Sequence, residues 1–199
     1  MRRSLVIVIT LALAFSMNAA PADLGRFAHW SRSAQAYFMT KAEREQWSTV
    51  STEAEAETFI ASFLNKRAKG FGAEVEQRVE QANKFLTVGK TQGSDTLRGK
   101  LLILLGTPAS MTVQEPPKRA AAQPDPTAIA RGGAAAADSS VKIYVMTFTR
   151  QTTPSLPQER LDVSVEVAAS SGRDRIRDPR MEQRLADAFE AAARASIVE

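Results

Sequence analysis

The apolar residues of this chain change their spacing near residue 90, and this change limits the folds open to it. Before that point they recur every three or four residues, as in amphipathic helices. After it they form short continuous or alternating runs, which are typical of strands. Helical spacing returns after Asp178 and Pro179, a pair suited to the start of a helix. The order of these patterns predicts an α+β domain.

Three helices are expected in the amino-terminal part. Thr40 and Thr52 are each followed three residues later by a glutamate, which is the capping-box pattern that opens a helix. A third helix is expected over about residues 73–88, because apolar side chains recur there at helical spacing. The helix after Thr52 has an apolar side that ends in a basic residue: Ala56, Phe59, Ile60, Phe63 and Arg67.

Three strands are expected after these helices. Residues 101–105 form a continuous apolar run between two glycines, short enough for a strand buried on both faces. Residues 141–148 are rich in β-branched and aromatic side chains and suit an inner strand. Residues 161–167 alternate strictly, which predicts one buried and one solvated face. No helical pattern separates these runs, so we expect a small, mainly antiparallel, three-stranded sheet covered by a carboxy-terminal helix.

Residues 107–140 are dominated by Ala, Pro, Gly, Gln and Ser. A stretch of this length without regular structure is most often a disordered insertion, and its prolines interrupt helices and strands. We therefore expect a flexible excursion between the first two strands, with residues 23–106 and 141–199 forming one domain around it. A proline-rich binding segment is the alternative.

The first residues have the composition of a cleavable export signal. Arg2 and Arg3 precede an apolar run over residues 5–15, and Ala20-Pro21-Ala22 has the small-x-small form that a signal peptidase accepts. Cleavage after Ala22 is expected. The run is shorter than the roughly 20 apolar residues that cross a bilayer, so no membrane span is expected after cleavage. The sequence has no cysteine for a lipoprotein anchor. These features predict an exported protein, periplasmic or secreted.

The composition argues against several classes of function. With no cysteine and the single histidine His29, the chain offers neither thiol catalysis nor a multi-histidine metal site, and no cofactor is expected. It has 26 basic and 22 acidic side chains, a near balance that argues against nucleic-acid binding. Two short basic clusters, at residues 66–69 and 173–177, are expected to be solvated surface.

Four stretches resemble a known bacterial family. They are MTKAEREQW at 39–47, FIASFLNKR at 59–67, RVEQANKF at 78–85 and RGKLLILLGTP at 98–108. Their order and spacing are similar to those of the GWxTD-domain proteins, an exported family. Where that family has Gly-Trp-x-Thr-Asp, this chain reads Gly93-Ser94-Asp95-Thr96-Leu97, so the tryptophan is missing. The resemblance implies an exported α+β domain and does not imply catalysis.

The segment at the position of that motif, residues 93–99, supplies the candidate ligand-binding residues. Asp95 and Arg98 could bind a polar ligand. Gly93, Thr96 and Gly99 are the other candidate residues of the segment. The competing interpretation is a turn whose Asp and Thr side chains hydrogen-bond their own backbone.

Two main functions follow from the sequence. The first is a non-enzymatic, exported module that binds another envelope or secreted protein, through aromatic residues expected to be exposed near the start: Trp30, Tyr37 and Phe38. The second is a small-ligand-binding protein or hydrolase that uses residues 93–99. No Gly-x-Ser-x-Gly motif accompanies His29, so no catalytic residue is assigned. A third interpretation is a structural aid to the assembly of a neighbouring protein.

Overall fold

The amino-terminal part of the protein is helical, as the spacing predicts. A computed structural model of the protein describes residues 23–115, 141–168 and 173–198. The expected export signal (1–22) and most of the expected insertion (116–140) lie outside these ranges. Short 3-10 turns precede the first two α-helices: η1 (Gly25–Phe27), η2 (Trp30–Arg32) and η3 (Gln35–Phe38), followed by α1 (Lys41–Ser48) and α2 (Glu53–Asn65).

Both predicted capping boxes are confirmed. At α1, the Thr40 hydroxyl oxygen accepts a hydrogen bond from the Glu43 N–H at 3.2 Å, while the Glu43 carboxylate accepts one from the Thr40 N–H at 2.9 Å. Thr52 and Glu55 make the same pair of bonds at α2. These bonds satisfy backbone N–H groups that a helix start leaves without partners, so the sequence alone fixes where α1 and α2 begin.

The third helix, α3 (Phe71–Leu86), begins two residues earlier than about residue 73, where it was expected. Gly70 precedes it with a φ of +93°, a left-handed conformation that only glycine adopts readily, and this allows the sharp turn after α2. The predicted apolar side of α3 faces the core: Val75, Ala82 and Leu86 are buried, and Val79 is partly buried.

The prediction of a strand over residues 101–105 is wrong, because these residues belong to α4 (Leu97–Leu105). All five of their side chains are buried, so the run is surrounded on every side. A short, wholly apolar run has no periodicity that separates a buried helix from a buried strand. The helical outcome agrees with the four leucines, which are good helix formers, and with Thr96 as the N-cap.

The sheet is antiparallel as predicted, but in the described ranges it has four strands rather than three, in the order β1-β2-β3-β4. The second and third expected strands are confirmed. The first strand lies instead inside the expected insertion, so that expectation is wrong for residues 110–114. A short edge strand also forms where only a basic cluster was expected. The strands are β1 (Ser110–Gln114), β2 (Val141–Thr149), β3 (Arg160–Ala168) and β4 (Asp174–Ile176).

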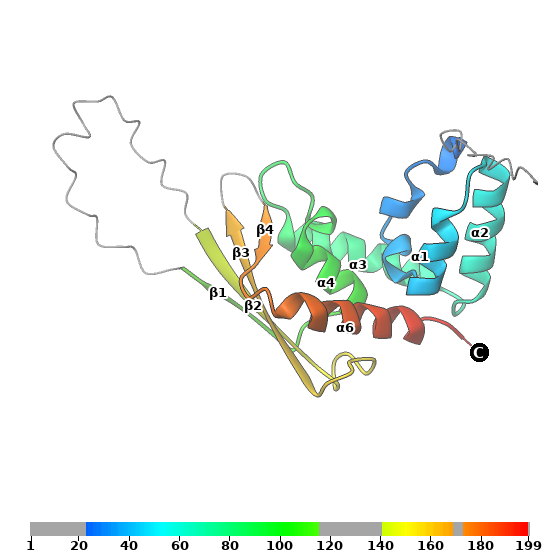
Figure 1. Ribbon diagram of the computed structural model, residues 1–199. Helices are drawn as coiled ribbons and strands as arrows, with labels where there is room; N and C mark the ends of the chain where they lie inside the picture. Colours follow the sequence, from blue (N-terminus) through cyan, green and yellow to red (C-terminus); the bar gives the residue numbers. More distant parts are fainter. Residues whose placement is uncertain (1–22, 116–140, 169–172, 199) are drawn as a thin grey trace, which may run out of the picture.

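The core lies between the sheet and the helices. The carboxy-terminal helix, α6 (Met181–Ala195), is confirmed, although it starts after Arg180 rather than at Pro179. It contacts α4, which also contacts α3 and β4. Figure 1 shows α1 and α2 at one end of the molecule and the sheet at the other, with α3, α4 and α6 between them. On β3 the alternation predicted from the sequence is confirmed, since Leu161, Val163, Val165 and Val167 are all buried.

Candidate functional site

The glycines of residues 93–99 are explained by close packing. Gly93 begins η4 (Gly93–Asp95), and a Cβ atom added there would lie 1.8 Å from the carbonyl oxygen of Ala82 in α3. A Cβ atom on Gly99 would lie 1.8 Å from the carbonyl oxygen of Gly93. No side chain fits at such a separation, so the two glycines allow η4 to pack against α3 and α4 against η4.

Thr96 has a structural role of the kind that the competing interpretation expected. Its hydroxyl donates a hydrogen bond to the Gly93 carbonyl oxygen at 2.7 Å and accepts one from the Gly99 N–H at 3.0 Å. The side chain is buried and forms the N-cap of α4. Thr96 therefore ties the segment to its own backbone rather than facing a ligand.

Arg98 does not face Asp95, as the ligand-binding hypothesis requires. Its guanidinium is buried and bonds the carboxylate of Asp174 in β4, with Nε at 3.0 Å and 3.2 Å from the two oxygens. The Asp174 carboxylate also accepts the Arg98 backbone N–H at 2.9 Å. The guanidinium carbon lies 4.2 Å from the centre of the Tyr144 ring. Arg98 thus joins α4 to two strands, and Asp95 remains exposed.

One of the predicted residues, Tyr37, lies beside Lys100 of α4, and the charge of Asp95 acts on it. The Lys100 ammonium lies 4.9 Å from the centre of the Tyr37 ring and 5.6 Å from that of Phe189. Burial, and to a lesser extent the negative charge of Asp95, raises the pKa of Tyr37. Burial, together with the positive charge of Arg44, lowers the pKa of Lys100. Its ammonium has no carboxylate partner in the described ranges.

The aromatic residues near the start are less exposed than expected. Phe38 is buried, and Trp30 and Tyr37 are half-buried against the core. The Trp30 ring lies 4.9 Å from that of Trp47 and 5.2 Å from that of Phe63, centre to centre. His29, beside this aromatic cluster, is exposed. The expectation of an exposed aromatic surface is therefore wrong for Phe38 and holds only in part for the other two.

A buried ion pair in the helical part was not expected from the sequence. Arg67 lies in one of the basic clusters predicted to be solvated, yet its side chain is fully buried. Its guanidinium bonds both carboxylate oxygens of Glu43, at 2.8 Å and 3.1 Å, and the carbonyl oxygens of Phe38 and Phe63. The one signal for this was the position of Arg67 at the end of the apolar side of α2.

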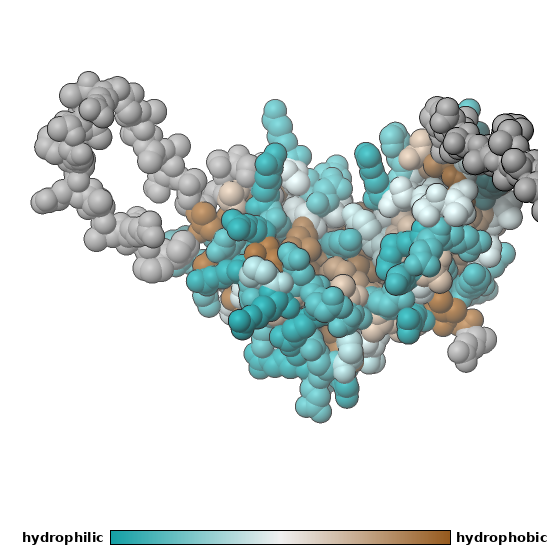
Figure 2. Space-filling view, viewed as in Figure 1, coloured by the Kyte–Doolittle hydropathy of each residue, from teal (hydrophilic) through white to brown (hydrophobic). Residues whose placement is uncertain are grey.

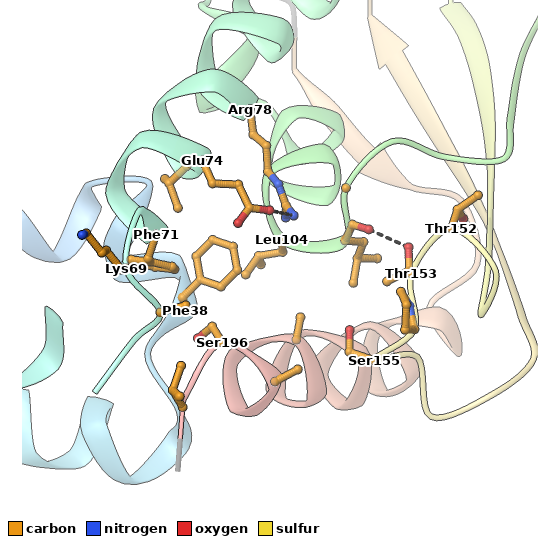
Figure 3. Close-up of a pocket in the computed structure, with 18 residues that line it drawn as sticks. Phe38, Lys69, Phe71, Glu74, Arg78, Leu104, Thr152, Thr153, Ser155 and Ser196 are labelled. Carbon is orange, nitrogen blue, oxygen red and sulfur yellow. Dashed lines mark hydrogen bonds and ion pairs between the residues drawn. The ribbon is translucent and has the colours of Figure 1, made fainter. Parts of the chain in front are cut away.

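A cavity of about 280 Å³ lies where α3, the carboxyl ends of α4 and α6, and the loop at residues 152–155 meet. Phe38, Phe71 and Leu104 contribute to its apolar wall, and Figure 3 shows the Phe38 ring near its middle. This volume is just below the usual range of about 300–1,000 Å³ for ligand pockets.

The polar groups drawn next to that wall are used by the fold. The Arg78 guanidinium donates to the Ile103 carbonyl oxygen at 2.7 Å and pairs with Glu74, while the Thr153 hydroxyl donates to the Leu105 carbonyl oxygen at 2.6 Å (Figure 3). These bonds satisfy carbonyl groups that the end of α4 leaves without helical partners. The cavity is thus a junction between elements, and these groups do not orient a ligand.

The β1 strand is the most conspicuous exposed feature of the described residues. It is an edge strand, paired only with β2, and all five of its residues are exposed. Met111 lies opposite Met146 and Val113 opposite Tyr144, so the two share the face on which Met146 is fully buried. Yet Met111 and Val113 are 44% and 51% exposed. Figure 2 shows hydrophobic atoms at the surface over this end of the sheet.

The described residues therefore define an α+β domain with a free, partly apolar sheet edge. Comparison of the chain with protein-family models, with curated proteins and with solved structures finds no match. The resemblance to GWxTD-domain proteins thus stays a prediction.

In the described ranges no group of three or more His, Asp or Glu side chains could hold a metal ion. No helix in those ranges is long and apolar enough to cross a membrane.

Proposed function

We propose that this chain is an exported, non-enzymatic protein-binding module of the cell envelope, and that β1 is its binding surface. The observation that carries the proposal is the unpaired outer edge of β1, together with the exposure of Met111 and Val113 beside it. The predicted export signal and the resemblance to an exported family support the location.

An open edge of this kind is a template for another strand. Its outward N–H and C=O groups have no strand partner among the described residues, and an added strand would supply hydrogen bonds to them. Natural proteins usually protect such edges with charged residues or proline, and β1 has neither. Apolar side chains left exposed on the core-facing side of the sheet would lose contact with water on binding, which favours association.

Position-specific photo-crosslinking in the producing cells tests this function. A photoreactive amino acid replaces Thr112 in the centre of β1, and Phe85 in a matched control. Phe85 lies on α3 and is 64% exposed, so it offers an apolar surface away from the sheet. We expect one dominant protein adduct from position 112, identified by mass spectrometry, and its loss when Val113→Lys is added. Equal adducts from both positions, or none from position 112, would overturn the proposal.

A second candidate function is the binding of a small anionic ligand at Lys100. The observation that favours it is the half-buried Lys100 ammonium, which lies over two aromatic rings without a carboxylate partner in the described part of the chain. The carboxylate or phosphate of a ligand would give this ammonium an anionic partner. This candidate predicts that some anion raises the unfolding temperature of the wild-type protein and not that of Lys100→Met. The Asp95→Ala variant should bind the same anion at least as well, because it removes the negative charge that acts on Tyr37 beside Lys100.

A further inference from the structure

We propose that the partner of β1 is the β1 strand of a second copy of this chain, paired antiparallel about a twofold axis at Thr112. This inference rests on the proposed function, because it names the occupant of the same sheet edge. It makes the protein a symmetric dimer with one continuous sheet running through both copies, a common way for identical chains to associate.

The sequence of β1 suits pairing with itself. It reads Ser-Met-Thr-Val-Gln, with polar and apolar residues in strict alternation about the central Thr112. Of the antiparallel registers open to two identical five-residue strands, only the one centred on Thr112 pairs all five residues. In that register Met111 faces Val113 of the other copy, and Ser110 faces Gln114. Directly opposed residues project from the same face of a sheet, so apolar side chains meet apolar ones and polar meet polar.

The charges on β1 also favour a copy of the same strand. None of its residues is charged, and neither are the β2 residues opposite them, so two copies would not repel each other at the edge. An oppositely charged partner segment would find no charge to pair with along residues 110–114. A neutral strand with the same alternation is the complement that this edge favours, and another copy of the chain supplies it wherever the protein is present.

The burial pattern leaves room for the second copy. On the side of the sheet that faces the helices, Met146 of β2 is fully buried. Its neighbour Met111 of β1 is 44% exposed, so β2 is covered on this side and β1 is not. A twofold axis perpendicular to the sheet keeps the helices of both copies on one side. It places Met111 and Val113 of each copy next to those of the other, in the space between the two helical layers.

Charge substitution at Thr112 tests the pairing, because this residue faces itself across the axis. The purified full chain is examined by light scattering and analytical ultracentrifugation as wild type, as Thr112→Lys and as Thr112→Glu. Like charges placed directly opposite should raise the dimer dissociation constant severalfold, up to about fivefold, in each single variant. An equimolar mixture of the two variants should regain the dimer, since opposite charges then face each other. Thr58→Lys, at an exposed threonine of α2, is the matched control and should leave dimerisation unchanged.

The mixing step separates lost pairing from lost folding, since misfolded chains would not regain a dimer together. A wild-type dimer that Thr112→Lys leaves intact would overturn the inference, because the copies would then associate through another surface. A monomer whose position 112 crosslinks to a different protein would overturn this inference and leave the proposed function standing. A monomer with no adduct from position 112 would overturn both. An adduct within the same chain would show an internal occupant and also overturn both.

Discussion

Replacing Arg67 by methionine should destabilise the protein strongly, because the Arg67 guanidinium is buried and both of its terminal nitrogens are hydrogen-bonded. It contacts two oxygens of Glu43 and two backbone carbonyls at distances between 2.6 Å and 3.1 Å, and it lies 3.3 Å from the centre of the Phe63 ring. The Glu43 side chain is only 7% exposed. Methionine would fill part of the space but would leave this carboxylate buried beside Thr40 without a counter-charge.

The expected loss follows from that arrangement. Removing one partner of a buried ion pair typically costs about 3–5 kcal/mol. The free energy of unfolding of a whole domain is about 5–15 kcal/mol, so the Arg67→Met protein should be close to the limit of stability. With a urea dependence of about 2 kcal/mol per molar, the unfolding midpoint should fall by roughly 2 M.

Tryptophan fluorescence during urea unfolding provides the assay. The chain has two tryptophans, and both lie in the helical part, where the Trp30 ring is 5.2 Å from the ring of Phe63, the residue under Arg67. Arg26→Met is the matched control: Arg26 pairs with two glutamates on the surface and is 62% exposed, so its loss should cost less than about 1 kcal/mol. If Arg67→Met loses no more stability than Arg26→Met, the reasoning about the buried pair is refuted. The double variant with Glu43→Gln should recover part of the loss, because no buried charge then remains.

Three other variants test the charge on Glu43 and the packing of two glycines. Burial alone would raise the pKa of the Glu43 carboxyl, but hydrogen bonds from Arg67 and Thr40 and the Arg67 charge hold that pKa below its usual 4.5. This group therefore contributes stability above its unfolded pKa that is lost as pH falls through the lower folded pKa, and Glu43→Gln should flatten the acid side of a plot of unfolding midpoint against pH. Gly99→Ala should lower the free energy of unfolding by about 1–3 kcal/mol through overpacking against a backbone carbonyl. Gly89→Ala, where φ is +59° and the surroundings are open, should cost about 1–2 kcal/mol. Urea unfolding measures both, and a larger loss at residue 89 would contradict the packing argument.

The helices that were predicted correctly are those with local signals. Thr40, Glu43, Thr52 and Glu55 act within four residues of chain, so capping could be predicted from neighbouring residues alone. The strands β2 and β3 were also predictable, because alternation and β-branched residues reflect which side of a strand is buried. These elements account for most of the α+β architecture.

The buried ion pairs could not be predicted in the same way. The partners of Arg67 and Arg98 lie 24 and 76 residues away in sequence, so nothing near either arginine indicates that it is buried. The Arg98 partner, Asp174, belongs to the short strand β4, whose sequence resembles a solvated basic cluster. The failure at residues 101–105 has a related cause, because the choice between helix and strand there depends on packing with α3, α6 and the sheet.

The segment at the position of the family's motif, residues 93–99, has a physical explanation without a ligand. Gly93 and Gly99 are set by backbone contacts, Thr96 by helix capping and Arg98 by its bond to Asp174. Each of the four would be required in a protein that folds this way and binds nothing at residues 93–99. Residues that the fold itself requires do not show where a ligand or partner binds. Binding should therefore use groups that have no bonding partner within the fold. In the described part of the chain, the β1 edge and the Lys100 ammonium are such groups, and the edge offers the larger surface.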